Sequence, residues 1–112
     1  MESNTTLTQF GTSFQSKIIT SCLLDSMFLQ TIMEVLQPEY FESDANSWLA
    51  KTINEYFNKY KTTPTLEALK IEIENIENDV FKISVVEGLK DAWRYREAND
   101  LQFVQEKTLD FC

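Results

Sequence analysis

The chain has 112 residues, the length of one small domain. Apolar residues make up 43% of it and it has only 2 Gly and 2 Pro, a composition that disfavours a disordered chain, a collagen-like chain and a turn-rich β sandwich. Its 18 acidic and 10 basic residues give a net charge of -8, which repels phosphate backbones and anionic lipids, so we expect no direct binding to nucleic acid or membranes.

The sequence carries neither a disulfide framework nor a targeting segment. Cys22 lies in an apolar stretch and Cys112 is the last residue, a spacing that fits no metal site. No positively charged leader precedes an apolar segment, and no apolar run approaches the ~20 residues that cross a bilayer. We therefore expect a cytoplasmic protein with reduced thiols.

Polar residues 1–11 predict a flexible N-terminal tail ahead of the first helix. The segment Thr12-Ser13-Phe14-Gln15 has the spacing of a capping box, in which a hydroxyl and a side-chain amide satisfy backbone N–H groups. After it, apolar residues recur at three- and four-residue steps up to Asp25, and again from a cap at Ser26 to Pro38. We expect two helices joined as a hairpin. Their apolar positions are Phe14, Ile18, Ile19, Cys22 and Leu23, then Phe28, Leu29, Ile32, Met33 and Leu36.

Two more helices follow an aromatic turn. Residues 38–41 predict a turn whose aromatic rings close one end of the helical core, and Ser43 or Asp44 can cap the third helix. Residues 61–64 end that helix at a proline, and Thr65 can cap the fourth. The broad apolar side of the third helix indicates a central position in the fold. The apolar positions are Trp48, Leu49, Ile53, Tyr56, Phe57 and Tyr60 in the third helix and Leu66, Leu69, Ile73 and Ile76 in the fourth.

A polar spacer at residues 75–79 separates the fourth helix from the fifth, which ends at the charged link 94–99. Gly88 lies inside the fifth helix, where glycine costs roughly 1 kcal/mol relative to alanine. It therefore indicates either a close contact or a local weakness. The apolar positions of this helix are Phe81, Val85, Val86, Leu89, Ala92 and Trp93.

The pattern predicts that the last segment is also a helix, which Asn99 or Asp100 can cap. No glycine or proline stops this helix before Cys112. We therefore expect the chain to be a piece of a longer protein. This amphipathic segment is either the final strut of the bundle or a helix that pairs with another subunit. The candidate self-association residues are Phe103, Val104, Leu109 and Phe111.

The predicted fold class is all-α, because no strand-like alternation of useful length competes with these helices. We expect a compact orthogonal bundle of five to six helices. The head domain covers residues 12–98, and residues 99–112 begin a linker or hairpin helix that the chain truncates.

The residues that most enzymes need are missing from the sequence. There is no histidine, the commonest general base and metal ligand, and no glycine-rich loop that could hold a nucleotide phosphate. Cys22 has no base to activate it, so we interpret it as a buried, inert thiol. The acidic cluster Glu72, Glu74, Glu77 and Asp79 lacks the spacing of a calcium loop and is interpreted as a solvated face. We predict no catalytic, metal or cofactor site in this chain.

One basic cluster and one aromatic group remain as candidates for binding. Lys90, Arg94 and Arg96 lie near the end of the fifth helix, where they either stabilise the helix C-terminus or contact a partner's acidic face or nucleic acid. The aromatic residues of the third helix could stack bases, but their helical spacing without interleaved arginine favours core packing.

Three segments resemble a known family. Pro38-Glu39-Tyr40-Phe41-Glu42-Ser43, Asn54-Glu55-Tyr56 and Thr63-Pro64-Thr65-Leu66-Glu67-Ala68-Leu69 are similar to the N-terminal domain of replicative hexameric DNA helicases of the bacterial DnaB type, in the version found in T4-like phages. The order of features agrees with that resemblance: an apolar hairpin, an aromatic turn, a long helix and a helix that starts after a proline. The resemblance covers residues 18–76 well and the remainder only in pattern.

The resemblance implies a non-enzymatic head domain that associates with its copies into a hexameric collar and docks the primase or the helicase loader. The motor domain, which binds ATP and magnesium, would lie outside these residues. The family's partner-docking positions match no motif in this sequence, so the candidate partner contacts are the basic residues Lys90, Arg94 and Arg96. A different class stays open: a free-standing small helical adaptor, such as a viral regulator that binds one host protein.

Overall fold

Short polar side chains fix most of the helix starts in this chain. Such a side chain accepts a hydrogen bond from a backbone N–H that the helix itself leaves unpaired. The carboxylate of Asp25 accepts bonds of this kind from the N–H groups of Met27 and Phe28. The other side chains that cap helices in the same way are Ser43, Thr65 and Asn78.

The computed structural model describes residues 7–112, and every regular element in this range is a helix. The predicted all-α fold class is confirmed. In chain order the elements are the 3-10 helix η1 (Leu7–Phe10), α1 (Thr12–Leu24), α2 (Ser26–Ile32), the 3-10 helix η2 (Pro38–Tyr40), α3 (Asp44–Tyr60), α4 (Leu66–Glu74), α5 (Asp79–Arg94) and α6 (Leu101–Phe111).

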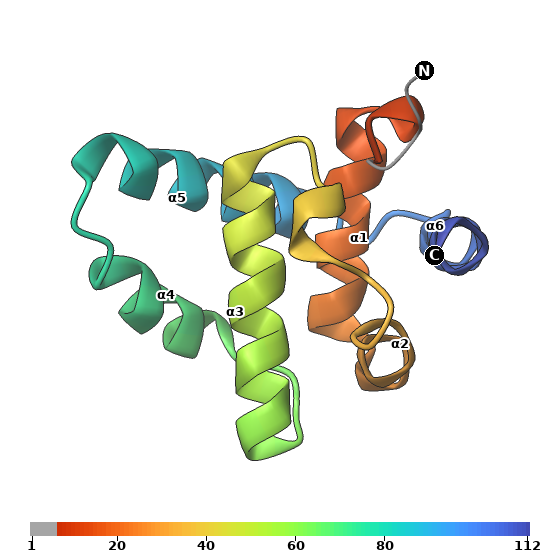
Figure 1. Cartoon of the computed structure of the whole chain (residues 1–112), viewed down its shortest axis with the longest axis horizontal. Coiled ribbons are helices and arrows are strands. Elements are labelled where there is room, and N and C mark those ends of the chain that lie inside the picture. The colour runs from red at the N-terminus through yellow and green to blue at the C-terminus, as the bar shows by residue number, and fades with distance from the viewer. Residues whose placement is uncertain (1–6) are drawn as a thin grey trace.

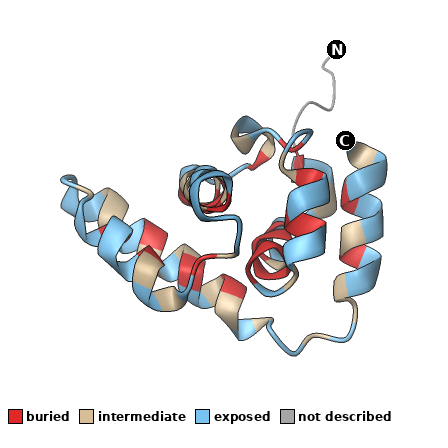
Figure 2. Ribbon diagram, turned by 90° about the horizontal axis from the view of Figure 1, so that it is seen from below, coloured by how far each residue is buried: buried red, intermediate tan, exposed pale blue. Residues whose placement is uncertain are grey.

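Helix α1 is the axis around which the other helices pack. It contacts α2, α3, α5 and α6, and Figure 1 shows it between α3 and α6. Ile18, Ile19, Thr20 and Ser21 are each completely buried, so α1 is enclosed on all sides, whereas the sequence predicted one buried face. In Figure 2 the buried positions lie on the inward sides of the helices and the exposed positions on the outward sides.

Three details of the first two helices differ from the prediction. The capping box is wrong: Gly11 is the N-cap of α1 without a side-chain hydrogen bond, because the Gln15 amide is buried and bonds elsewhere. Asp25, rather than Ser26, caps α2. Helix α2 also ends at Ile32, well before the predicted stop.

The predicted flexible tail over residues 1–11 is only partly described. Residues 1–6 lie outside the described range, and residues 7–10 form η1. Leu7 is completely buried, and its carbonyl oxygen accepts a hydrogen bond from Gln15 Nε2 at 3.2 Å. The prediction is therefore wrong for residues 7–10, which are held against α1.

The middle of the chain follows the prediction closely. Ser43 caps α3 and Thr65 caps α4, which confirms these two predicted caps. Lys61 ends α3 in the left-handed conformation, with φ 62°. The aromatic turn forms η2, where Tyr40 is half-buried and the following Phe41 is buried.

The two glycines have opposite structural roles, which single alanine substitutions can separate. Gly11 has φ 86°, a conformation that alanine rarely adopts. Gly88 lies in the middle of α5, where a Cβ would be 3.5 Å from Ala45 Cβ and Leu49 Cδ1, an ordinary contact distance. We expect Gly88→Ala to raise the free energy of unfolding by about 0.5–1 kcal/mol and Gly11→Ala to lower it by about 1 kcal/mol. Thermal unfolding followed by circular dichroism measures both changes; a loss of stability in Gly88→Ala would mean that α3 and α5 leave no room for a methyl group.

Candidate assembly and docking surfaces

The outer face of α6 is the first candidate surface. Val104 is 1% exposed and packs into the core, whereas Phe103 is 55% and Leu109 is 41% exposed. The inner face of the helix packs on α1, and Lys17 Nζ lies 2.9 Å from Asp100 Oδ2 at its start. In this structure the last helix is therefore a strut of the bundle.

This packing exposes some of the four predicted self-association residues and buries others. Phe111 is half-buried, with its ring centroid 5.8 Å from that of Phe10 and 5.4 Å from that of Tyr40. The prediction that Val104 is a contact residue is wrong, because that side chain is inside the core. Of the four predicted residues, Phe103 and Leu109 are the two that are exposed. They lie about 120° apart around the helix, so they border its outer face and do not form one stripe.

The predicted basic cluster lies at the C-terminal end of α5. Arg96 Nη1 donates to the Trp93 carbonyl oxygen at 2.9 Å, so this arginine caps the helix end, as one of the two interpretations predicted. Lys90 and Arg94 form ion pairs with carboxylates one turn earlier on the same helix, at N–O distances of 3.7 and 2.8 Å. Both pairs are exposed, and exposed pairs contribute little to stability. The three cations are therefore accessible to a partner.

A groove beside this cluster adds residues that the sequence pattern did not indicate. Leu66 and Lys70 of α4 face Leu89 and Trp93 of α5 across a hollow of about 330 Å³ that the three cations also line. Lys70 is remote from the basic cluster in the sequence and comes beside it only because α4 packs on α5. The sequence did contain one signal for Lys70: it follows Leu66 by four residues, so the two side chains lie on the same face of the predicted helix.

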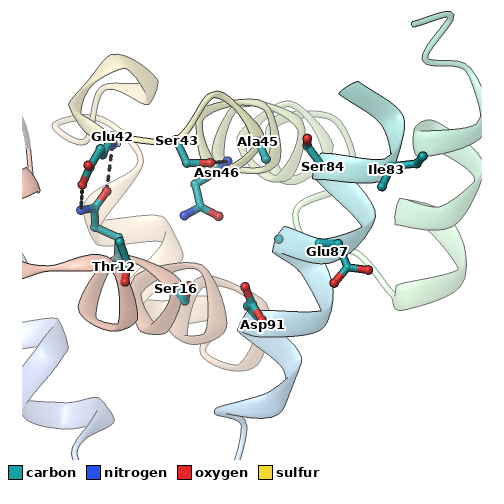
Figure 3. Close-up of a pocket in the computed structure, with 12 residues that line it drawn as sticks. Thr12, Ser16, Glu42, Ser43, Ala45, Asn46, Ile83, Ser84, Glu87 and Asp91 are labelled. Atoms are coloured by element: carbon teal, nitrogen blue, oxygen red, sulfur yellow. Dashed lines mark hydrogen bonds between the residues drawn. The ribbon is translucent and has the colours of Figure 1, made fainter. Parts of the chain in front are cut away.

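Figure 3 shows a cleft on another side of α5, between the start of α1, the segment after η2 and the first turn of α3. Its volume is about 610 Å³, and the carboxylates of Glu42, Glu87 and Asp91 line it. Glu87 and Asp91 are also the partners of Lys90 and Arg94. The cleft is therefore acidic, but its charge is partly neutralised from within the chain.

Two buried amide side chains shape this cleft. Gln15 is 1% exposed, and its Oε1 accepts a hydrogen bond from Glu42 N at 2.8 Å, which Figure 3 draws. Asn46 is 8% exposed, and its Oδ1 has no hydrogen-bond partner within residues 7–112. The sequence pattern places Gln15 in a capping box, because its partner Glu42 is 27 residues away in the chain, and it gives no signal for the burial of Asn46.

Neither Cys22 nor the acidic cluster at residues 72–79 forms a reactive or metal-binding site within residues 7–112. Burial, with a smaller contribution from the charge of Asp25, raises the pKa of the Cys22 thiol to about 12, so the thiolate does not form at neutral pH. No group of three or more cysteine, aspartate and glutamate side chains in the described residues could hold a metal ion. The four carboxylates of the cluster at residues 72–79 are exposed, as expected of a solvated face.

The aromatic residues of α3 are divided between core and surface. Phe57 is buried and Trp48 is half-buried, but Tyr60 is 54% exposed. The rings of Tyr56 and Tyr60 contact each other with centroids 4.6 Å apart. The prediction that Tyr60 belongs to the core is therefore wrong, because it lies in the last turn of α3, which extends past α1 (Figure 1).

Comparisons with known proteins identify no relative. No protein-family model, no curated protein and no solved structure matches this chain. In the part of the chain that the structure describes, no helix is long and apolar enough to span a membrane.

Replacing Gln15 removes a link between η1, α1 and the start of α3. We expect Gln15→Leu to lower the free energy of unfolding by about 2 kcal/mol, because the Glu42 N–H and the Leu7 carbonyl lose a buried partner. Urea denaturation measures the change. The matched control is Gln30→Leu on the exposed side of α2, which should change stability by less than about 0.5 kcal/mol. Equal losses in the two variants would contradict the role assigned to Gln15.

The two thiols should differ in reactivity. Cys22 is buried and Cys112 is exposed, so we expect iodoacetamide at about pH 8 to alkylate the folded chain at Cys112 only. Cys22 should react once denaturant unfolds α1. Peptide mass spectrometry identifies the modified residue, and Cys112→Ser should leave the folded chain unmodified. Rapid alkylation of Cys22 without denaturant would mean that α1 is not enclosed.

Proposed function

We propose that this chain is a non-catalytic assembly and docking domain, of the kind found at the N-terminus of DnaB-type replicative helicases. The observation that carries the proposal is that Phe103 and Leu109, at the two borders of the outer face of α6, stay exposed although the inner face of the helix is packed. Covering such side chains contributes ~25 cal/mol per Å² of apolar area. An outward helix face of this kind favours contact with another copy of the domain.

The positions of the resembling segments support the same function. Residues 38–43 form η2 and the cap of α3, and residues 63–69 form the cap and first turn of α4 together with the link before it. The third segment, residues 54–56, lies inside α3. Most of the matched residues thus form turns, helix caps or a first helical turn, which build the fold. This fits a domain whose work is done by its surfaces.

The mechanism in this proposal is geometric. Six copies in a ring would arrange six motor domains, which bind ATP and magnesium, around the DNA. Contacts that are weak for one copy gain strength through multivalency. The net charge of -8 would keep the head from competing with the motor for DNA. The basic end of α5 is the candidate contact for the primase or the helicase loader.

A free-standing helical adaptor is the second candidate, and the packing of α6 favours it. Val104 and Thr108 tie this helix to the core, and Lys17 pairs with Asp100 at its start. The bundle is thereby closed without a second copy. In that function the exposed residues of α6 would contact one partner protein and not identical subunits.

Light scattering on a longer chain separates the two candidates. The chain is extended by about 60 residues, enough for a helical hairpin, and we expect a hexamer-sized particle. Phe103→Asp should dissociate it, because a carboxylate buried in an apolar contact without a partner costs several kcal/mol. Leu109→Asp should act in the same direction. An extended chain that stays monomeric at high concentration would exclude the collar and leave the adaptor.

The matched control for this experiment is Met27→Asp. Met27 is 77% exposed on α2, so the same charge added there should leave the particle size unchanged. Circular dichroism of each variant checks that the helices are retained. If Met27→Asp dissociates the particle as strongly as Phe103→Asp, α6 is not the interface.

A further inference from the structure

The groove between α4 and α5 combines apolar and basic residues in an otherwise acidic molecule. Two adjoining hollows of about 290 and 330 Å³ share Lys70, Leu89 and Lys90, so they form one continuous depression along the two helices. Figure 1 shows α4 and the first half of α5 on the side of α3 away from α6, while the end of α5 passes behind α3 toward α1. The residues that line the groove lie in α4, in α5 or just after α5, whereas the candidate self-association surface lies on α6.

The rim of the groove is cationic. Of the 10 basic residues in the chain, four line it, including both arginines, whereas Glu74 is the one acidic residue among the described residues that line it. The ion pairs that two of these cations make within α5 are exposed, and pairs of this kind are exchanged for a partner's carboxylates at little cost. The four cations are Lys70, Lys90, Arg94 and Arg96.

The floor of the groove is apolar. Leu89 is 7% and Ile73 is 3% exposed, while Leu66, Val86 and Trp93 are half-buried. At 1.5 Å per residue, the run of α5 from Val86 to Trp93 is about 10 Å long. That length equals the separation of the first and third anchors, at i and i+7, of an amphipathic helix that binds in a groove.

We propose that this groove binds an acidic amphipathic helix of a partner protein. Its apolar side chains would lie on the floor and its carboxylates at the rim. Arg94 and Arg96 suit this contact, because a guanidinium group donates two parallel hydrogen bonds to one carboxylate. The inference rests on the proposed docking function and names the chemistry of the segment that is docked.

Two other occupants fit the groove less well. A single nucleic-acid strand would meet the field of a chain of charge -8 and one aromatic ring, Trp93, where stacking proteins use several. Helix α6 of a second copy would present Phe103 and Leu109 about 120° apart, with Glu106 and Asp110 between them. A groove of this kind takes a single apolar stripe.

A fluorescein-labelled synthetic peptide tests the proposal on the chain as it stands. The peptide has about 14 residues, with leucines at i, i+3 and i+7 and glutamates at most other positions. Fluorescence anisotropy gives the Kd. We expect saturable binding that weakens as salt is added and no binding of a peptide in which lysine replaces every glutamate.

Charge-reversal variants locate the site. Lys90→Glu combined with Arg94→Glu should weaken peptide binding by about tenfold or more. The control pair, Lys51→Glu with Lys107→Glu, makes the same charge change at exposed positions of α3 and α6 and should change the Kd by less than about twofold. Chemical-shift changes in NMR spectra on adding the peptide should be confined to α4 and α5.

Besides a failure to bind the peptide, three results would overturn the proposal. The first is that the two variant pairs weaken peptide binding equally. The second is that the groove binds a single-stranded DNA oligonucleotide more tightly than the peptide. The third is that the chain self-associates and that Lys90→Glu with Arg94→Glu abolishes this self-association. The light-scattering test is read separately. A monomeric extended chain that binds the peptide would retain the groove and reject the collar, and a hexameric chain that does not bind it would retain the collar and reject the groove.

Discussion

The enclosure of α1 is the constraint on which the rest of the structure depends. Within residues 7–112 four other α-helices pack around it, and Ile18 and Ile19 are completely excluded from solvent. Most polar atoms on a helix buried in this way need internal partners, and on α1 the Ser21 hydroxyl is an exception, with no partner within residues 7–112. The Thr20 hydroxyl donates to the Ala92 carbonyl oxygen of α5 at 2.5 Å, and Gln15 bonds η1 and the start of α3. These directional bonds fix how α1 is turned against its neighbours, which apolar contact alone does not specify.

The position of α5 follows from α1, and it decides where charge lies on the surface. The inward residues of α5 are buried, so Glu87 and Asp91 line the cleft while Lys90 and Arg94 line the groove. The acidic cleft and the basic groove adjoin along this helix, where Lys90 pairs with Glu87 and Arg94 with Asp91. The chain carries a local positive surface that its net charge of -8 does not reveal. Such a surface suits an acidic partner because complementary charge selects the partner and speeds the encounter.

Helix α6 connects the stability of the fold with the proposed assembly. Val104 and Thr108 hold its inner face to the core, so association through the outer face would not have to order the helix first. The ring of Phe111 contacts Phe10 and Tyr40, which joins the last helix to the beginning of the described chain. Self-association would then add buried area to a closed bundle.

The sequence by itself determined the features that depend on neighbours along the chain: the all-α class, the caps of α3 and α4, and the basic cluster at the end of α5. It misplaced the features set across space. The amide of Gln15 found partners in η1 and ahead of α3, Val104 turned into the core because α1 lies there, and the groove needed Lys70 beside Lys90. Only the tertiary structure decided these three features, because burial and the proximity of charges depend on which helices pack together. A 3.6-residue period predicts which face of a helix is apolar, but it does not predict which other helix packs on that face.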